Sequence, residues 1–352
     1  MAKKPMTKSQ MVTHFAKKSE LSKKTSSRAK AESKARKLCS VCALLLGLAI
    51  LFLPIGSFSQ AQQRLNGAIA KLSEGKTIFG VWSSNRDLRN ARMIGGANID
   101  YVIYDTEHQP FDMHNFHQFL MNLRGPDGKF KVTPFIRIPA YGREVEKNNW
   151  VVKQVLDLGA MGIIFPHIDT PEMAEQAVSS MRYPAFKDSP YQTPPGHRGW
   201  SPGEATATWG ISAAEYGKRA DLWPLNPNGE LLLIVLIESP MAIENLDKIL
   251  SVPGVGAVFV GPMDLQSNMG YRGQGFTMPG AGAPAANTAK PEAEQLIQKA
   301  LATCKKHNTP VAILTNSMDV KARVAQGFNM PTIGSDGGFT ADTYKCLELL
   351  GR

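Results

Sequence analysis

From residue 77 onward, short apolar runs alternate along the chain with segments of helical periodicity. Most of the runs are continuous in Val, Ile, Leu or Phe, which is typical of strands that are buried on both faces. Strands of this kind occur in parallel sheets whose faces are covered by helices. The predicted strands are 78–82, 101–104, 132–138, 162–165, 231–237, 257–260, 311–314 and 332–333.

Helical stripes lie between several of these runs. The clearest follows Pro291, where apolar residues recur every three or four positions up to Cys304; shorter stripes occupy 173–181 and 243–250. Eight strands interleaved with helices over about 290 residues predict a (β/α)8 TIM barrel, here placed at residues 75–350. An open doubly wound sheet is the alternative, but it is expected to carry a Gly-rich turn after its first strand, and Phe79–Ser83 is not one.

The chain before residue 62 follows a different pattern. Residues 1–38 are rich in Lys and Ser with few large apolar side chains, which predicts a disordered basic segment. The apolar run Val41–Ile55 is shorter than the about 20 residues that span a bilayer. Small residues at Ser59 and Ala61 complete the pattern of a secretory signal. Residues 39–61 are therefore predicted to be a signal peptide cut after Ala61, or a retained anchor.

This leader also explains the net charge of +10. Residues 1–38 hold twelve Lys or Arg and two acids, whereas the remainder has equal numbers of basic and acidic residues. A neutral body lacks the electrostatic footprint of a nucleic-acid-binding protein. We therefore expect no nucleic-acid partner, contact with a membrane only through residues 41–55, and an exported or anchored protein in preference to a cytoplasmic one.

Two carboxylates follow neighbouring predicted strands. In a barrel, the carboxyl ends of the strands form one face, on which side chains converge. Glu238 and Asp264 would lie there, and two hard oxygen ligands can hold Mg²⁺, Mn²⁺ or Co²⁺. A carboxylate pair bonded to backbone or Arg at the rim is the alternative. Zinc is disfavoured because no Cys/His ligand spacing is present.

Further titratable residues follow the second, third and fourth strands. His108, beside Asp105 and Glu107, is a candidate general base because imidazole titrates near neutral pH. Arg137 is placed to pair with a carboxylate or to stabilise an oxyanion. His167 has a similar position but no obvious partner. No lysine falls clearly at a strand end, which disfavours a Schiff-base mechanism.

Together these motifs resemble the HpcH/HpaI family of class II, metal-dependent pyruvate or 2-keto-3-deoxy-acid aldolases, within the HpcH/HpaI aldolase/citrate lyase superfamily. The resemblance covers roughly residues 75–345, and the order and spacing of the motifs make it specific. The matching stretches are Tyr104–His108, Pro134–Pro139, Leu156–Ala160, Gly162–Pro166, Arg182–Pro184, Gly196–Gly199, Ile237–Ser239 and Val260–Leu265.

The resemblance implies a role for each candidate residue. Glu238 and Asp264 would ligate the divalent metal, which would chelate a pyruvate unit and stabilise its enolate. Arg137 would contact the keto oxygen, and His108 would be the base, oriented by Asp157 in a His–Asp dyad. The positions that would shape substrate binding are Gly261, Pro262, Asp105 and Glu107.

The resemblance also implies the reaction, which is a carbon–carbon lyase reaction that cleaves or forms 4-hydroxy-2-oxo acids. The small-molecule partners would be a 2-oxo acid (pyruvate) and an aldehyde, and the enzyme would be a homo-oligomer. Two alternatives stay open: a citrate-lyase-type enzyme acting on an acyl-CoA, and a non-catalytic exported binding barrel. The sequence departs from the family pattern at Leu236, where many members have Gln two residues before the metal Glu.

Overall fold

The structure is a computed structural model that describes residues 8–9, 12–14, 16–23, 25, 63–139, 147, 149–272, 289–335 and 341–352. Contacts divide the chain into two units, Met1–Gln63 and Arg64–Arg352. In the first unit the described residues form exposed helical turns between 8 and 25, where the sequence predicted disorder; Ala, Lys, Glu and Leu in this stretch favour helix. The predicted signal segment at 39–61 lies outside the described residues. Among those that are described, no helix is both long and apolar enough to cross a membrane.

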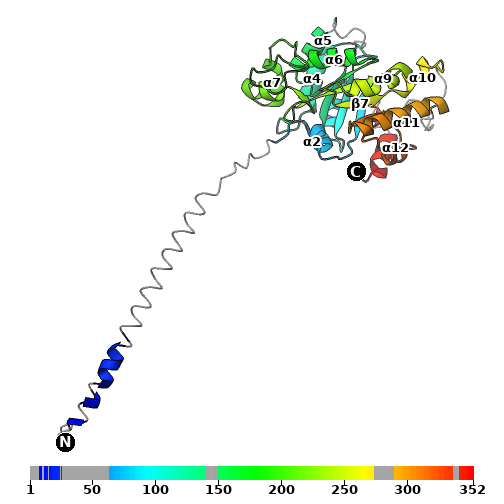
Figure 1. Cartoon of the computed structure of the whole chain (residues 1–352). Helices are drawn as coiled ribbons and strands as arrows, with labels where there is room; N and C mark the ends of the chain where they lie inside the picture. Colours follow the sequence, from blue (N-terminus) through cyan, green and yellow to red (C-terminus); the bar gives the residue numbers. More distant parts are fainter. Residues whose placement is uncertain are drawn as a thin grey trace. The chain divides into compact units, whose positions relative to one another are not determined.

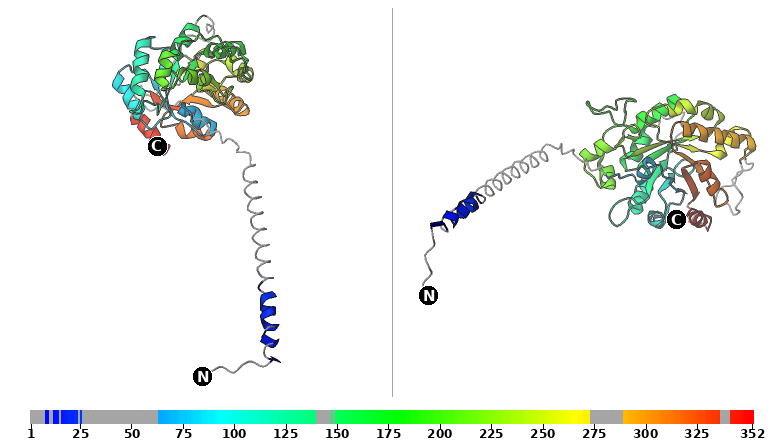
Figure 2. Two further views of the ribbon diagram at one scale, coloured as in Figure 1. Left: turned by 90° about the vertical axis from the view of Figure 1, so that its left-hand side faces the viewer. Right: turned by 60° about the horizontal axis from the view of Figure 1, so that its bottom comes forward.

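The second unit is a closed barrel of eight parallel strands surrounded by helices (Figure 1, Figure 2). The ring closes because β4 pairs with β6 as well as with β3, and the two-residue strand β5 pairs with β6 outside it. This confirms the (β/α)8 fold and excludes the open doubly wound sheet. The strands are β1 (Gly80–Ser83), β2 (Tyr101–Asp105), β3 (Thr133–Arg137), β4 (Gly162–Phe165), β5 (Leu222–Trp223), β6 (Leu231–Ile237), β7 (Ala257–Val260), β8 (Val311–Leu314) and β9 (Met330–Ser335).

Several helices begin where a short polar side chain accepts a hydrogen bond from one of the first backbone N–H groups. Asp112, Thr170 and Ser239 do this at the starts of α4, α6 and α9. The three predicted helical stripes are confirmed as α6, α9 and α11. The helices are α2 (Gly67–Ser73), α3 (Leu88–Gly96), α4 (Met113–Leu123), α5 (Asn149–Asp157), α6 (Pro171–Met181), α7 (Gly203–Trp209), α8 (Ala213–Arg219), α9 (Pro240–Leu250), α10 (Pro262–Asn268), α11 (Pro291–Lys306), α12 (Val320–Gln326) and α13 (Ala341–Leu349).

Each strand contributes to two separate apolar cores. In β6, Leu232, Ile234 and Leu236 point into the barrel, whereas the alternate residues pack in the layer between strands and helices. Every residue of β6 is buried. The continuous apolar run in the sequence is thus the consequence of burial on both faces.

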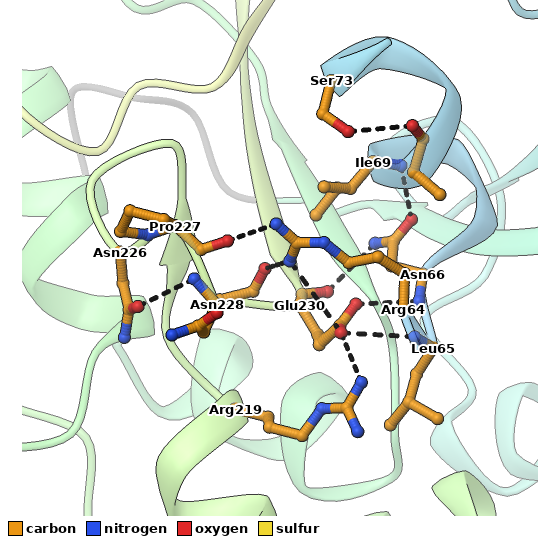
Figure 3. Close-up of polar contacts among 12 residues, drawn as sticks. Arg64, Leu65, Asn66, Ile69, Ser73, Arg219, Asn226, Pro227, Asn228 and Glu230 are labelled. Atoms are coloured by element: carbon orange, nitrogen blue, oxygen red, sulfur yellow. Dashed lines mark hydrogen bonds and ion pairs between the residues drawn. The ribbon is translucent and has the colours of Figure 1, made fainter. Parts of the chain in front are cut away.

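Helix α2 closes the barrel at the amino-terminal ends of the strands, because Ala68, Ile69 and Leu72 join the inner core. The chain before α2 is fixed by the buried carboxylate of Glu230, which accepts hydrogen bonds from the backbone N–H of Leu65 and Asn66 at 3.2 and 2.9 Å. Arg219 donates to the same carboxylate at 2.6 Å (Figure 3). The compact unit therefore includes a helix that lies before the predicted boundary at residue 75. The sequence missed it because seven residues are too few to show a helical period.

Candidate active site

The two predicted metal-ligating acids lie at the carboxyl ends of β6 and β7, which are adjacent strands. Glu238 is the single residue between the end of β6 and Ser239, the N-cap of α9, and its side chain is only 4% exposed. Asp264 lies in the first turn of α10, directly after β7. The backbone of Gly261 passes close to Glu238: a Cβ atom on this glycine would lie 2.7 Å from Oε1 of the carboxylate. Both acids therefore face the same end of the barrel.

A cavity of about 250 Å³ opens at this end of the barrel. It brings together most of the residues that the sequence predicted, from the ends of four strands, β2, β3, β6 and β7, and the segments that follow them. The predicted residues that line it are Asp105, His108, Arg137, Glu238, Gly261, Pro262 and Asp264. The others in its wall are Trp82, Ser84, Gln109, Leu236, Phe259, Met263, Leu314 and Gly334.

Arg137, the last residue of β3, is buried and held on three sides. Its Nε donates to Asp105 Oδ1 at 2.8 Å, and its Nη1 lies 2.7 Å from Glu107 Oε2. Its guanidinium carbon lies 4.3 Å from the centre of the Trp82 ring. Burial of Asp105 is outweighed by the hydrogen bond and charge of Arg137, which lower the pKa of this carboxyl. The guanidinium is thus fixed at the pocket wall by two carboxylates and one ring.

Negative charge remains in excess around Glu238. Burial, followed by the charges of Asp264 and Glu107, raises the pKa of Glu238 well above its usual value. Burial also raises the pKa of Glu107, although Arg137 beside it acts in the opposite direction. A cation between Glu238 and Asp264 would relieve this repulsion, so the donor set fits a divalent metal that prefers oxygen ligands. Among the residues that the structure describes, no group of three or more His, Cys, Asp or Glu side chains is arranged to hold a metal ion.

His167 contacts two of the acids, which the sequence did not predict. Its Nδ1 lies 3.3 Å from Glu238 Oε2 and its Nε2 lies 3.7 Å from Glu107 Oε1. Its backbone N–H also donates to Glu238 Oε2 at 3.2 Å. The residue has a φ of 54°, in the left-handed region that residues other than Gly adopt infrequently, with Asn, Asp and His the most common exceptions. This backbone turn determines both contacts and is invisible in the pattern of residue types.

His108 and Asp157 do not meet within this chain. His108 lies in the loop after β2, at the carboxyl end of the barrel, and the charged neighbours whose pKa it influences are Asp105 and Glu107. Asp157 is the last residue of α5 and precedes β4, which places it at the opposite end of the parallel strands. Its carboxylate pairs with Arg198 Nη2 at 2.7 Å. The expected His108–Asp157 dyad is therefore not formed by these two residues of one chain.

A sequence profile described as HpcH/HpaI aldolase/citrate lyase matches residues 79–342, which is most of the chain. The chain belongs to this family. It is 35% identical over 212 residues to the hydroxypyruvate/pyruvate aldolase of Roseobacter denitrificans, covering 60% of this chain and 72% of that one. It is 29% identical over 268 residues to the 2-keto-3-deoxy-L-rhamnonate aldolase of Escherichia coli K12, covering 76% and 85% of the two chains.

A solved structure of an HpcH/HpaI aldolase/citrate lyase family protein from Burkholderia cenocepacia J2315 has a similar fold. The TM-score is 0.64 at 25% sequence identity, and the match covers 82% of this chain and all of that one. Family membership makes this protein a carbon–carbon lyase of the class II aldolase type. The hypothesis of a non-catalytic barrel is thereby set aside.

Proposed function

We propose that this HpcH/HpaI enzyme cleaves and forms 4-hydroxy-2-oxo acids, with pyruvate and an aldehyde as the other side of the reaction. Glu238 and Asp264 would hold a Mg²⁺, Mn²⁺ or Co²⁺ ion. The single observation that carries the proposal is the convergence of these two acids with Arg137 and His108 on one small cavity. The names of the relatives, which are aldolases for 2-oxo acids, support the substrate class.

Arg137 and His108 have separate tasks in this proposal. In the cleavage direction His108 accepts the proton of the 4-hydroxyl. The C3–C4 bond then breaks to release the aldehyde, and the electron pair of this bond forms the enolate of pyruvate. Protonation of C3 then gives pyruvate. The guanidinium of Arg137, already fixed by Asp105 and Glu107, places positive charge where the keto oxygen becomes negative. A divalent cation, when bound, adds Lewis-acid stabilisation of the same negative charge.

The proposal is tested by incubating the enzyme with pyruvate, Mn²⁺ and a panel of aldehydes and detecting products by mass. We expect aldol products that disappear when EDTA is added and return with excess Mn²⁺. Glu238→Gln and Asp264→Asn should each lower kcat/KM by at least about 100-fold, the scale on which a single electrostatic group contributes to catalysis. Glu204→Gln is the control, because Glu204 is a 65% exposed acid on α7 away from the cavity.

Two outcomes would count against the proposal. Aldol products that persist in EDTA would contradict the role of a metal ion. Glu238→Gln and Asp264→Asn variants as active as the Glu204→Gln control would contradict the role of the two acids. Release of acetyl-CoA from a malyl or citramalyl thioester, without aldol products, would favour the acyl-CoA alternative instead.

A further inference from the structure

The imidazole of His167 lies between two buried carboxylates at the carboxyl ends of the barrel strands. Its Nδ1 is 3.3 Å from Glu238 Oε2, and its Nε2 is 3.7 Å from Glu107 Oε1. The two acids are 4% and 5% exposed, and the imidazole is 21% exposed. His167 is outside the described wall of the cavity, and the reaction proposed above gives it no task.

These contacts continue along neighbouring strands to Arg137. In the ring, β2 pairs with β3, β3 with β4, and β4 with β6. Glu107 follows β2 and Arg137 ends β3, and Nη1 of the guanidinium lies 2.7 Å from Glu107 Oε2. His167 follows β4, and Glu238 follows β6. A continuous series of contacts therefore joins the guanidinium to the candidate metal ligand, and His167 is the residue that completes it.

The two carboxylate oxygens of Glu238 face different neighbours. Oε2 faces His167, whose backbone N–H also donates to it at 3.2 Å. Oε1 faces Gly261, because a Cβ on this glycine would lie 2.7 Å from it. Gly261 is the N-cap of α10, and Asp264 lies in the first turn of that helix. His167 thus contacts one oxygen of the carboxylate, and the other is on the side of the second acid.

A donor at this position also acts against the repulsion among the acids. Burial, followed by the charges of Asp264 and Glu107, raises the pKa of Glu238 well above its usual value. A carboxylate has to lose its proton before it binds a metal ion. An imidazole N–H that faces the carboxylate stabilises its ionised form and fixes its orientation. The same ring separates Glu238 from Glu107.

We propose that His167 is a positioning residue whose Nδ1 holds Oε2 of Glu238, so that Oε1 stays turned toward α10 and is available to a divalent cation. The proposal rests on the proposed function, because it concerns the metal-binding acid of the same site. Glu107, itself held by Arg137, contacts the other nitrogen of the ring. The cation site and the guanidinium then keep a fixed relation to each other.

The test measures the affinity of the full chain for Mn²⁺ by calorimetric titration, without substrate. His167→Gly removes the imidazole, and glycine adopts the φ of 54° without strain. We expect the Kd for Mn²⁺ to rise about 10- to 100-fold, as it does when a ligating group loses its supporting hydrogen bond.

His167→Asn is the rescue variant. Asparagine also adopts the left-handed region, and its amide nitrogen is bonded to Cγ as Nδ1 of histidine is, so it can donate to Glu238. We expect this variant to recover most of the Mn²⁺ affinity that His167→Gly loses. A role confined to backbone conformation would not produce this recovery, because glycine already satisfies the backbone.

Asn308→Gly is the matched control, because Asn308 has a φ of 53° and lies between α11 and β8, at the opposite end of the strands. Its Mn²⁺ affinity should equal that of the wild type. Equal affinities in His167→Gly and Asn308→Gly would overturn the positioning role, as would binding in His167→Asn that is as weak as in His167→Gly. If circular dichroism shows that His167→Gly does not fold, His167→Ala takes its place.

Failure of the proposed function gives a different result. A wild-type protein that binds no Mn²⁺, or a Glu238→Gln variant that binds it as tightly as the wild type, would contradict the metal site itself and the role of His167 with it. Tight binding in the wild type, weak binding in Glu238→Gln and unchanged binding in His167→Gly would contradict the role of His167 alone.

Discussion

Gly261 and Glu238 share a space that leaves no room for another carbon atom. A Cβ on Gly261 would lie 2.7 Å from Glu238 Oε1, so Gly261→Ala has to displace the carboxylate. We expect the affinity for Mn²⁺, measured by calorimetric titration, to fall about 10- to 100-fold, as it does when the support of a metal ligand is lost. Gly203→Ala is the matched control, because its Cβ would have no neighbour within 4 Å. Equal Mn²⁺ affinities in the two variants would contradict the assignment of Glu238 as a ligand.

The clustered acids also predict how stability depends on pH. Burial and mutual repulsion raise the pKa of Glu238 and Glu107 above the usual 4.5, so both groups hold protons more tightly in the folded protein than in the unfolded one. Their stabilising contribution is complete below pH 4.5 and is lost as the pH rises through their folded pKa values. In EDTA, the free energy of unfolding by urea should therefore decrease over this range. In Glu238→Gln the free energy of unfolding should fall less with rising pH than in the wild-type protein. A pH profile identical to that of the wild type would show that Glu238 does not cause the fall.

The sequence alone predicted the positions of some site residues correctly and those of others wrongly. Glu238 and Asp264 could be predicted because they directly follow apolar strands, and strand ends converge in a barrel. Asp157 was assigned from a motif, although its position just before the predicted strand 162–165 already placed it at the amino-terminal end of the barrel. The contacts of His167 depend on a φ of 54°, and no pattern of neighbouring residues signals that backbone turn.

At the level of elements, α2 is held to the barrel by a buried ionic contact. The side chain of Glu230 is 1% exposed and satisfies two backbone N–H groups as well as Arg219 (Figure 3). Glu230→Gln removes the charge that Arg219 faces, so we expect the free energy of unfolding to fall by about 3 kcal/mol. Glu74→Gln is the control, because Glu74 pairs with Lys76 at the surface and its side chain is 56% exposed. In this variant the free energy of unfolding should change by less than about 1 kcal/mol. Comparable losses in both variants, measured with urea, would show that Glu230 contributes no more than a surface pair.

The strands were more predictable than α2, the helix that closes the amino-terminal end of the barrel. Runs such as Leu231–Ile237 are buried on both faces, and this burial appears in the sequence as unbroken hydrophobicity. Helix α2 has seven residues and buries three of them, which is too short a pattern to distinguish from a loop. The segment before α2 is bound by Glu230, which lies far from it in the sequence, so a local pattern could not show where α2 packs.

For the whole molecule, the export prediction concerns residues outside the described part of the chain. We expect the mature protein to begin at Gln62, because small residues precede this point at the positions that signal peptidases require. Intact mass and N-terminal sequencing of protein isolated from the cells that make it would show this directly. A full-length chain in the membrane fraction would indicate a retained anchor, and a full-length chain in the soluble cytoplasm would contradict both forms of export.

The plug that α2 forms at one end of the barrel has a kinetic consequence. Because Ala68, Ile69 and Leu72 fill that end, both reactants have to enter at the carboxyl ends of the strands, beside His108. Whichever molecule sits deeper must enter first and depart last. In the proposed reaction the oxygens of pyruvate face Glu238, Asp264 and Arg137, so we expect pyruvate to bind deeper than the aldehyde. Product-inhibition patterns should then report a compulsory order in which the aldehyde leaves before pyruvate.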